Sequence, residues 1–267
     1  MKIAVCGKGG VGKTNIAASL AEHYARTGHS VIAIDADSSP NLALSLGLSA
    51  DEASRIMPVA DNEELIRLKT GTDYSGVFRL TFTVDDIISR FAVTTPAGPN
   101  LLVMGTVKAM GSGCTCPAHS VMKAILRHLV VERDEVVILD MEAGIEHLGR
   151  GTAEHVDTLL VVSDANWKSR ETASAIIRLA RDSAIRDIRL AGNRIATPLE
   201  EEILRACAVE NQVPLACLIP YDRDVADAGI SGEAVRNTGI GAPAAIALLA
   251  DDLAGTGENK SWGRSQQ

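Results

Sequence analysis

The sequence predicts an α/β fold in which a mostly parallel, doubly wound sheet is flanked by helices. Short aliphatic runs recur along the chain, and segments with helical periodicity alternate with them. Hydrophobic residues make up 46% of the 267 residues whereas aromatic residues make up 3%, so Ala, Val, Ile and Leu must fill the core. Such a core suits parallel strands covered by helices better than an aromatic-rich β-sandwich.

Seven aliphatic runs have the length of buried strands. They are Lys2–Cys6, Val31–Asp35, Leu101–Met104, Val136–Asp140, Thr158–Val162, Ile188–Gly192 and Leu215–Ile219. Helical periodicity appears in Lys13–Arg26, His119–Glu132, Ser169–Asp182, Leu199–Glu210 and Ala244–Leu253. Because ligands of parallel sheets bind at the C-terminal ends of the strands, the residues that follow the strands are the candidate site residues.

Residues 48–98 interrupt this alternation with acidic turns, a helical pattern near Asp61–Lys69 and an amphipathic stretch around Val84–Phe91. We interpret them as an insertion on the same domain, either a partner surface or a solvated helical excursion. No linker rich in Pro, Gly or Ser divides the chain, so residues 1–254 are expected to form one domain. The polar residues 255–267 are expected to form a disordered tail.

The overall composition excludes several classes of protein. Lys and Arg number 26 against 34 Asp and Glu, and the resulting net charge of −8 argues against nucleic acid as a partner. No apolar run reaches the ~20 residues of a membrane span, and no signal peptide is recognisable. Five cysteines do not suggest a disulfide framework. We therefore expect a soluble, cytoplasmic protein without a membrane partner.

The segment from Gly7 to Thr14 reads GKGGVGKT, follows a predicted strand and opens a predicted helix, as a phosphate-binding loop requires. Its glycines let backbone N–H groups converge on phosphate oxygens, and the helix N-terminus adds its dipole. Lys13 can neutralise the β- and γ-phosphates, and the Thr14 hydroxyl can ligate Mg²⁺. The residues expected to bind the nucleotide here are Gly9, Gly10, Val11, Gly12, Lys13, Thr14 and Asn15.

A second lysine, Lys8, lies inside this loop. The loop thereby resembles the deviant Walker A motif of the P-loop NTPase family that includes nitrogenase iron protein, MinD and the ParA partition ATPases. The resemblance implies a nucleotide-dependent homodimer in which Lys8 reaches the nucleotide of the partner subunit, which would make both Lys8 and Lys13 catalytic. The alternative is that Lys8 is a solvent-exposed loop lysine.

Carboxylates end two of the predicted strands. Asp35 and Asp37 lie where switch I of this family lies, and the resemblance implies that Asp37 is catalytic and orients the attacking water. Asp37 can alternatively cap a following helix, while Asp35 is placed nearer the metal. Asp140 resembles the Walker B residue that holds a Mg²⁺-bound water, and Gly144 would sense the γ-phosphate.

Three later residues resemble the adenine pocket of the family. Asn193 ends a strand and matches the base-reading asparagine, although an asparagine in this place is also a common turn residue. Pro220 and Asp222 follow the last predicted strand. No Asn-Lys-x-Asp guanine signature is present, so the nucleotide is expected to be ATP or ADP rather than a guanine nucleotide.

Cys114 and Cys116 form a Cys-x-Cys loop ahead of the helix predicted at His119–Glu132. Two thiols at this spacing can hold one soft metal ion but cannot complete a four-coordinate site. A two-fold dimer would supply four thiolates. The alternatives are incidental thiols or a strained local disulfide. His119 could add a ligand, although a capping or surface role suits it better.

The loop lysine, the Cys-x-Cys pair and the string MEAGIEHL from Met141 to Leu148 together resemble CooC-type ATPases, accessory proteins for nickel insertion into carbon monoxide dehydrogenase. The resemblance spans Met1 to about Leu253. It implies that Mg²⁺-dependent ATP hydrolysis switches a homodimer between states that hold and release Ni²⁺ or Zn²⁺ at Cys114 and Cys116. The client would be carbon monoxide dehydrogenase.

Two other functions remain open at this point. Four thiolates can hold an iron–sulfur cluster, which would make the chain a cluster carrier or a reductase of the nitrogenase-iron-protein type. A positioning ATPase of the MinD or ParA type is the third hypothesis. The charge of −8 argues against DNA binding, and no basic amphipathic tail supports membrane binding.

Overall fold

The computed structural model of the chain describes residues 1–37, 40–71, 85–105, 121, 124–128, 135–141, 156–183, 185–232, 234 and 239–261. Its strands are β1 (Lys2–Gly7), β2 (Val31–Ala36), β3 (Val93–Thr94), β4 (Asn100–Val103), β5 (Val136–Met141), β6 (Thr158–Ser163), β7 (Ile188–Ile195) and β8 (Leu215–Pro220). All seven predicted strands are present. Strand β3 escaped prediction because two residues carry no detectable periodicity.

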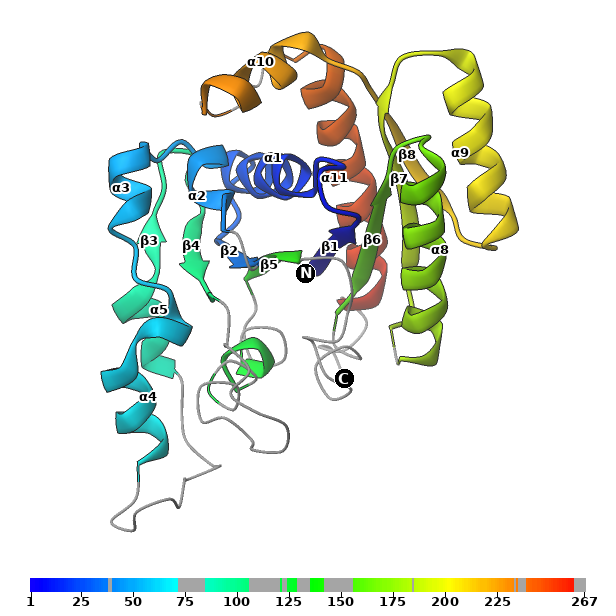
Figure 1. Cartoon of the computed structure of the whole chain (residues 1–267). Coiled ribbons are helices and arrows are strands. Elements are labelled where there is room, and N and C mark those ends of the chain that lie inside the picture. The colour runs from blue at the N-terminus through cyan, green and yellow to red at the C-terminus, as the bar shows by residue number, and fades with distance from the viewer. Residues whose placement is uncertain are drawn as a thin grey trace.

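The described strands form one eight-stranded sheet in the order β3-β4-β2-β5-β1-β6-β7-β8 (Figure 1). Neighbouring strands are parallel except for the antiparallel pair β3 and β4. Every residue of β1, β5 and β6 is buried, as expected for central parallel strands covered on both faces. The predicted fold class is therefore confirmed.

The described helices are α1 (Lys13–Arg26), α2 (Leu42–Ser45), α3 (Ala50–Ser54), α4 (Glu63–Thr70), α5 (Asp85–Phe91), α8 (Trp167–Asp182), α9 (Pro198–Glu210), α10 (Arg223–Ser231) and α11 (Gly241–Ser261), with a 3-10 turn at Val59–Asp61. Within the predicted helix His119–Glu132, residues 121 and 124–127 are helical. Helix α9 begins where its sequence dictates, because Thr197 and Glu200 form a capping box and proline occupies the first turn. None of the described helices combines the length and the apolarity needed to cross a bilayer.

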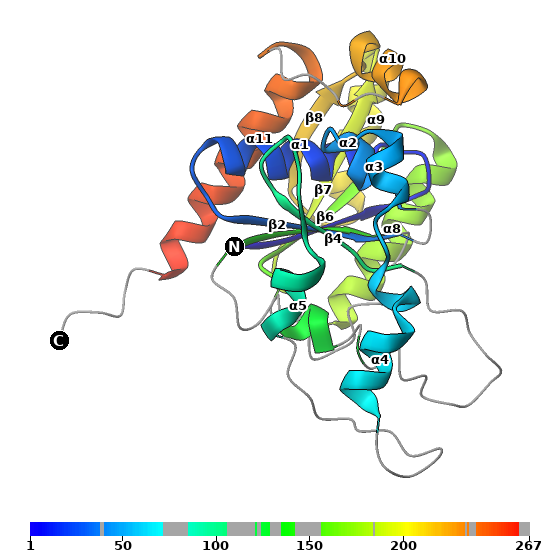
Figure 2. The same ribbon diagram turned by 90° about the vertical axis from the view of Figure 1, so that its left-hand side faces the viewer.

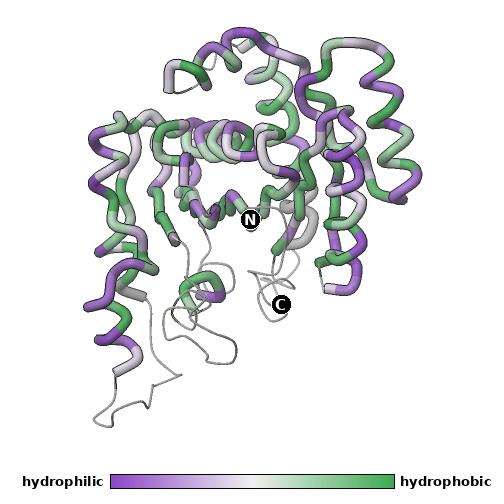
Figure 3. Tube along the Cα trace, viewed as in Figure 1, coloured by the Kyte–Doolittle hydropathy of each residue, from purple (hydrophilic) through white to green (hydrophobic). Residues whose placement is uncertain are grey.

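Two apolar layers cover the sheet. On one face α1, α2 and α11 pack on the strands, and on the other face α8 and α9 do so (Figure 2). In α1 the buried residues Ile16, Leu20 and Tyr24 recur every four positions and form one stripe. The Tyr24 hydroxyl donates to the Ala250 carbonyl at 2.8 Å and joins α1 to α11. In Figure 3 the outer helices alternate between hydrophilic and hydrophobic residues, as such one-sided packing requires.

The segment of residues 48–98 is anchored to the core. Val59, Leu65 and Ile87 are buried in the cluster that also contains residues of the central strands. Strand β3 lies in the same segment and pairs with β4 at the edge of the sheet. The described part of this segment is therefore not a solvated excursion, while a partner surface on it remains a prediction.

The C-terminal region contains more helix than the sequence predicted. Helix α10 was not predicted, since it is short and none of its side chains is fully buried. Helix α11 begins at Gly241 and continues to Ser261, past Gly255, where the polar tail was expected to begin. Propagation adds one hydrogen bond for each residue ordered, so a helix packed by its buried first half can extend into a polar sequence. Residues 262–267 lie outside the described part of the chain.

Candidate nucleotide site

The loop between β1 and α1 has a backbone that requires glycine at two positions. Gly7 and Gly12 have φ angles of +146° and +95°. A Cβ atom at Gly7 would overlap the Val162 carbonyl of the neighbouring strand β6, and one at Gly12 would overlap the side-chain amide of Asn193. Gly7 and Gly12 are therefore required both by conformation and by close packing, as in a loop whose N–H groups face a phosphate.

Lys13 lies at the first position of α1 and folds back over this loop. The residue is buried, and its Nζ atom lies 3.5 Å from the Lys8 carbonyl oxygen, to which it donates. The Val11 N–H donates to the same carbonyl at 3.4 Å. The Lys13 ammonium group thus lies beside the loop that would bind the phosphates. Lys8 itself is half-buried in this loop.

Asp35 and Asp140 are neighbours across the sheet, because β2 and β5 are parallel and pair these two residues directly. Both are fully buried. One Asp35 oxygen accepts the N–H of Asp37 at 3.2 Å and the other accepts that of Leu42 at 2.9 Å. Asp35 therefore shapes the connection from β2 to α2, which carries the half-buried Asp37.

Asp140 is the unsatisfied carboxylate of the site, since neither of its oxygens has a hydrogen-bond partner. Burial raises its pKa to about 7, and the charges of Asp35 and Asp37 add to the rise. The Thr14 hydroxyl and the Lys13 ammonium lower this pKa, but Thr14 is not within hydrogen-bonding geometry. An unpaired buried carboxylate beside a threonine hydroxyl is a donor set that suits Mg²⁺ and its bound water.

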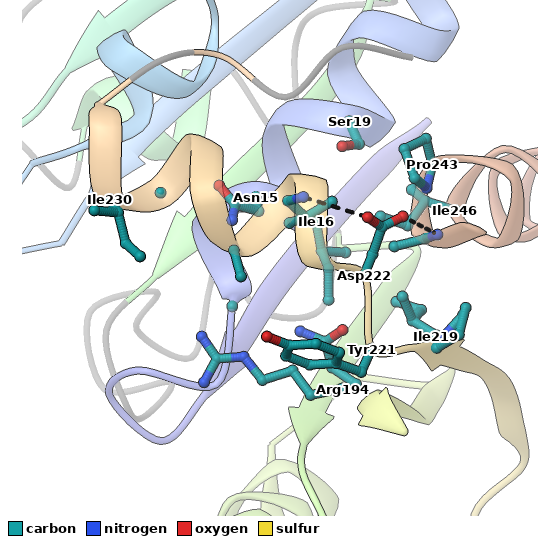
Figure 4. A pocket seen from close by; sticks show the side chains of 17 residues that line it. Asn15, Ile16, Ser19, Arg194, Ile219, Tyr221, Asp222, Ile230, Pro243 and Ile246 are labelled. Carbon is teal, nitrogen blue, oxygen red and sulfur yellow. Dashed lines mark hydrogen bonds between the residues drawn. The ribbon is translucent and has the colours of Figure 1, made fainter. Parts of the chain in front are cut away.

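A pocket of about 430 Å³ opens beside the loop (Figure 4). Its lining residues are Gly12, Asn15, Ile16, Ser19, Asn193, Arg194, Ile219, Pro220, Tyr221, Asp222, Val225, Ala226, Gly229, Ile230, Ala242, Pro243 and Ile246. Four residues predicted from the sequence to bind the nucleotide outside the GKGGVGKT segment, namely Asn15, Asn193, Pro220 and Asp222, lie together in this lining. The volume and the mostly apolar walls suit a nucleobase.

Sequence reasoning placed Tyr221 at the predicted adenine pocket only as part of the motif Pro220-Tyr221-Asp222, and it missed Arg194 and the walls contributed by α10 and α11. Figure 4 shows Arg194 and Tyr221 at the same end of the pocket. Tyr221 lies between two residues that had been predicted, so its position in that motif was the available signal. No sequence signal marks Arg194, whose backbone is in the left-handed region with a φ of +61°.

Asp222 lines the pocket, and its carboxylate also joins two helices. One oxygen accepts the N–H groups of Asp224 at 3.0 Å and Val225 at 3.3 Å and so caps α10. The other oxygen accepts the N–H of Ala242 at 3.0 Å in the first turn of α11. The dashed lines of Figure 4 show the contacts of this carboxylate with Val225 and Ala242. Asp222 therefore shapes the pocket by holding both of these walls.

The predicted metal ligands Cys114 and Cys116 lie outside the described residues, as do His119 and Gly144. Within the described ranges, no three His, Cys, Asp or Glu side chains gather as a metal-binding group. Of the cysteines described there, Cys6 and Cys207 are buried and Cys217 is half-buried. Burial raises the pKa of Cys217 to about 12, which keeps this thiol protonated and inert.

Comparison with known proteins identifies the family. The model of the CobQ/CobB/MinD/ParA nucleotide binding domain matches residues 2–235, which is most of the chain. The chain belongs to this family. It is accordingly a nucleotide-binding ATPase, as the phosphate loop predicted.

Two relatives match most of their own length. The carbon monoxide dehydrogenase accessory protein CooC of Rhodospirillum rubrum is 43% identical over 234 residues, which cover 87% of this chain and 88% of that protein. An uncharacterized ATP-binding protein of Methanocaldococcus jannaschii is 38% identical and covers 88% of this chain and 91% of its own length. The similarity to CooC confirms the resemblance that the sequence motifs had indicated.

Solved structures share the fold at low sequence identity. MinD in the MinC:MinD cell division protein complex of Aquifex aeolicus superimposes with a TM-score of 0.69 at 20% identity and covers 100% of this chain and 99% of its own. A cobyrinic acid a,c-diamide synthase of Mycobacterium smegmatis with a bound ATP analog and magnesium gives a TM-score of 0.62 at 20% identity, with 99% and 97% covered. These two matches show that the chain shares the fold of these proteins.

Proposed function

We propose that this chain is a Mg²⁺-dependent ATPase that dimerises when it binds nucleotide, holds a metal ion between its subunits and assists nickel insertion into carbon monoxide dehydrogenase. The observation that carries the proposal is the 43% identity with a carbon monoxide dehydrogenase accessory protein over 87% of the chain. The geometry of the phosphate loop and the adjoining pocket support the proposal that the chain binds a nucleotide. The Cys-x-Cys sequence supports its metal part.

Each residue of the nucleotide site has a role in this proposal. Lys13 neutralises charge on the β- and γ-phosphates, and Asp37 orients the attacking water from the connection that Asp35 organises. Thr14 and Asp140 are the residues that would hold the magnesium ion or its bound water. The ion supplies positive charge that polarises the phosphate oxygens. ATP is thus bound, oriented and hydrolysed at the C-terminal edge of the sheet.

The dimer and the metal site follow from the same proposal. Lys8 of each subunit stabilises charge on the nucleotide of the partner, so ATP binding and association are linked. Cys114 and Cys116 of both subunits provide four thiolates, which suit square-planar Ni²⁺ or tetrahedral Zn²⁺. The protein acts in the cytoplasm, with carbon monoxide dehydrogenase as its client and without binding nucleic acid or membrane.

Metal analysis of the anaerobically purified, reduced protein tests this proposal. The chain is stripped of metal and then offered nickel, zinc, or iron with sulfide, as wild type and as Cys114→Ala/Cys116→Ala. We expect one nickel or zinc ion per dimer in the wild type and none in the double variant. The matched control is Cys207→Ala/Cys217→Ala, which removes two thiols of the described core and should retain the metal.

Two results would contradict the metal assignment. Iron with stoichiometric sulfide at the same cysteines would move the function to cluster transfer or electron transfer. Metal retained by Cys114→Ala/Cys116→Ala, or no bound metal at all, would leave an ATPase without a metal site and favour a positioning role. ATP hydrolysis measured in the same samples shows separately whether the enzyme is intact.

A further inference from the structure

The side chain of Asn193 forms a hydrogen bond with the backbone of the phosphate loop. Its Nδ2 atom donates a hydrogen bond to the Val11 carbonyl oxygen at 2.7 Å. This contact is shorter than the two bonds that the Lys8 carbonyl accepts within the loop, at 3.4 Å and 3.5 Å. A Cβ atom at Gly12 would overlap the same Nδ2 atom, so the amide occupies the space that glycine leaves.

The strand that carries Asn193 departs from regular geometry at this point. The pairing of β7 with β8 has a register shift between Gly192 and Ile195, so Asn193 and Arg194 lie in an irregular stretch. Arg194 has a φ of +61°, a left-handed conformation that costs free energy in any residue other than glycine. Strained backbone of this kind is tolerated where it aims a functional side chain. Here the irregularity lies directly beside the amide that contacts the loop.

Asn193 also lines the pocket that suits the base, so one side chain contacts both parts of the nucleotide site. Three glycines of the loop, Gly7, Gly10 and Gly12, have positive φ angles. Glycine loses more conformational entropy on ordering than any other residue, so a loop of this composition needs external contacts to keep one conformation. The Asn193 bond links it to the rigid sheet.

We propose that Asn193 is a positioning residue that holds the phosphate loop in its binding conformation through the Val11 carbonyl and thereby couples the base pocket to the phosphate site. The inference rests on the nucleotide-binding part of the proposed function. Without this bond the loop is not held in one conformation before the ligand binds, so its conformational entropy is lost during binding. The affinity for phosphate therefore falls even when the ligand has no base. An asparagine that only reads adenine would have no such effect.

Base-free Mg²⁺-tripolyphosphate separates the two roles. Its affinity is measured by calorimetry beside that of Mg²⁺-ATP for the wild type, Asn193→Asp and Asn193→Ala. The aspartate keeps the shape of the side chain, removes the donor and adds a negative charge, whereas the alanine removes the donor without adding charge. We expect tripolyphosphate binding to weaken about five- to tenfold in both variants, the effect of losing one hydrogen bond. The control is Asn211→Ala, which removes another asparagine amide, one that donates to Ser174 Oγ at 2.9 Å and does not line the pocket, and this variant should leave tripolyphosphate affinity unchanged.

Hydrogen exchange of residues 8–14 in the nucleotide-free protein provides a second readout. Faster exchange of these amides in folded Asn193→Asp and Asn193→Ala, with no change in Asn211→Ala, supports the positioning role. Unchanged tripolyphosphate affinity together with unchanged exchange in both Asn193 variants would overturn it and leave Asn193 as a base-reading residue. Failure of the wild type to bind either ligand would instead overturn the nucleotide assignment itself.

Discussion

Two buried aspartates show how environment assigns different roles to one residue type. Asp35 and Asp140 are paired across β2 and β5 and are both fully buried. Asp35 accepts backbone N–H groups with both oxygens, so its role is to shape the chain. Asp140 accepts none, and an unsatisfied buried carboxylate destabilises the protein unless a ligand compensates it. The carboxylate that costs the protein stability when no cation is bound is therefore the one suited to the cation.

Substitution Asp140→Asn should stabilise the nucleotide-free, magnesium-free protein. The folded pKa of about 7 lies above the reference value of 3.8, so the folded state binds the extra proton between these pH values. Stability is consequently lost as the pH rises through this window, and the loss is complete above about pH 7. The shift bounds the gain in the variant at about 4 kcal/mol.

Thermal unfolding in EDTA at pH 5.5 and pH 8 checks this expectation. The difference in Tm between Asp140→Asn and the wild type should be larger at pH 8. Equal differences at the two pH values would show that the carboxyl does not titrate in this window. In the presence of Mg²⁺ and ATP the order should reverse, because only the wild type gains stability from the cation.

At the scale of elements, helix ends create the pocket beside the phosphate loop. Helices α10 and α11 form two of its walls, and Asp222 joins their N-termini. Further along α11, the hydrogen bonds of the Tyr24 hydroxyl with Ala250 and of His23 with Asp251 tie this helix to α1, which begins at the phosphate loop. The pocket walls and the phosphate loop are thus parts of one connected framework. Since α10 has no fully buried side chain, its position depends on its cap.

Removal of that cap should loosen this wall. Substitution Asp222→Ala leaves three backbone N–H groups without their acceptor and should lower the free energy of unfolding by about 1–2 kcal/mol. Urea denaturation measures the loss, and hydrogen exchange should locate it in α10 and the first turn of α11. Asp224→Ala removes the same charge from the first turn of α10 but no cap, so it should cost less than about 1 kcal/mol. Equal losses in the two variants would contradict the capping role.

At the scale of the whole molecule, the parallel sheet brings distant segments of sequence to one edge. The loop after β1, the connection after β2, the end of β5 and the ends of β7 and β8 meet there, because the C-terminal ends of parallel strands lie on the same side. The half-buried Lys8 lies on that edge. A second subunit facing it would place two nucleotides between two copies, as the proposed function requires.

Two lysine variants separate nucleotide binding from association. We expect Lys13→Ala to weaken ATP binding at least tenfold, because a charge contact to the phosphates is lost. Lys8→Ala should retain ATP binding but remain monomeric with ATP, because its charge acts on the nucleotide of the partner. Light scattering after size exclusion, with and without Mg²⁺-ATP, measures the dimer, and calorimetry measures the affinity. Equal losses of ATP affinity would rule out a role for Lys8 across the interface.

The sequence by itself determined the class of fold, the succession of most strands and helices along the chain, and the phosphate loop. These features are local, because strand and helix periodicity and the spacing of Gly7, Gly12 and Lys13 are written in neighbouring residues. For the same reason β3 and α10 were missed, since two residues or a helix without a buried stripe leave little local signal.

Tertiary structure decided which side chains share a site and what each has left to bind. Nothing local distinguishes the carboxylate of Asp35, occupied by backbone N–H groups, from that of Asp140, which has no partner. Equally, 182 residues separate Asn193 from the Val11 carbonyl that it contacts. Pairing across the sheet and the irregular end of β7 create these contacts, and hydrogen bonding and burial depend on neighbours in space rather than in sequence.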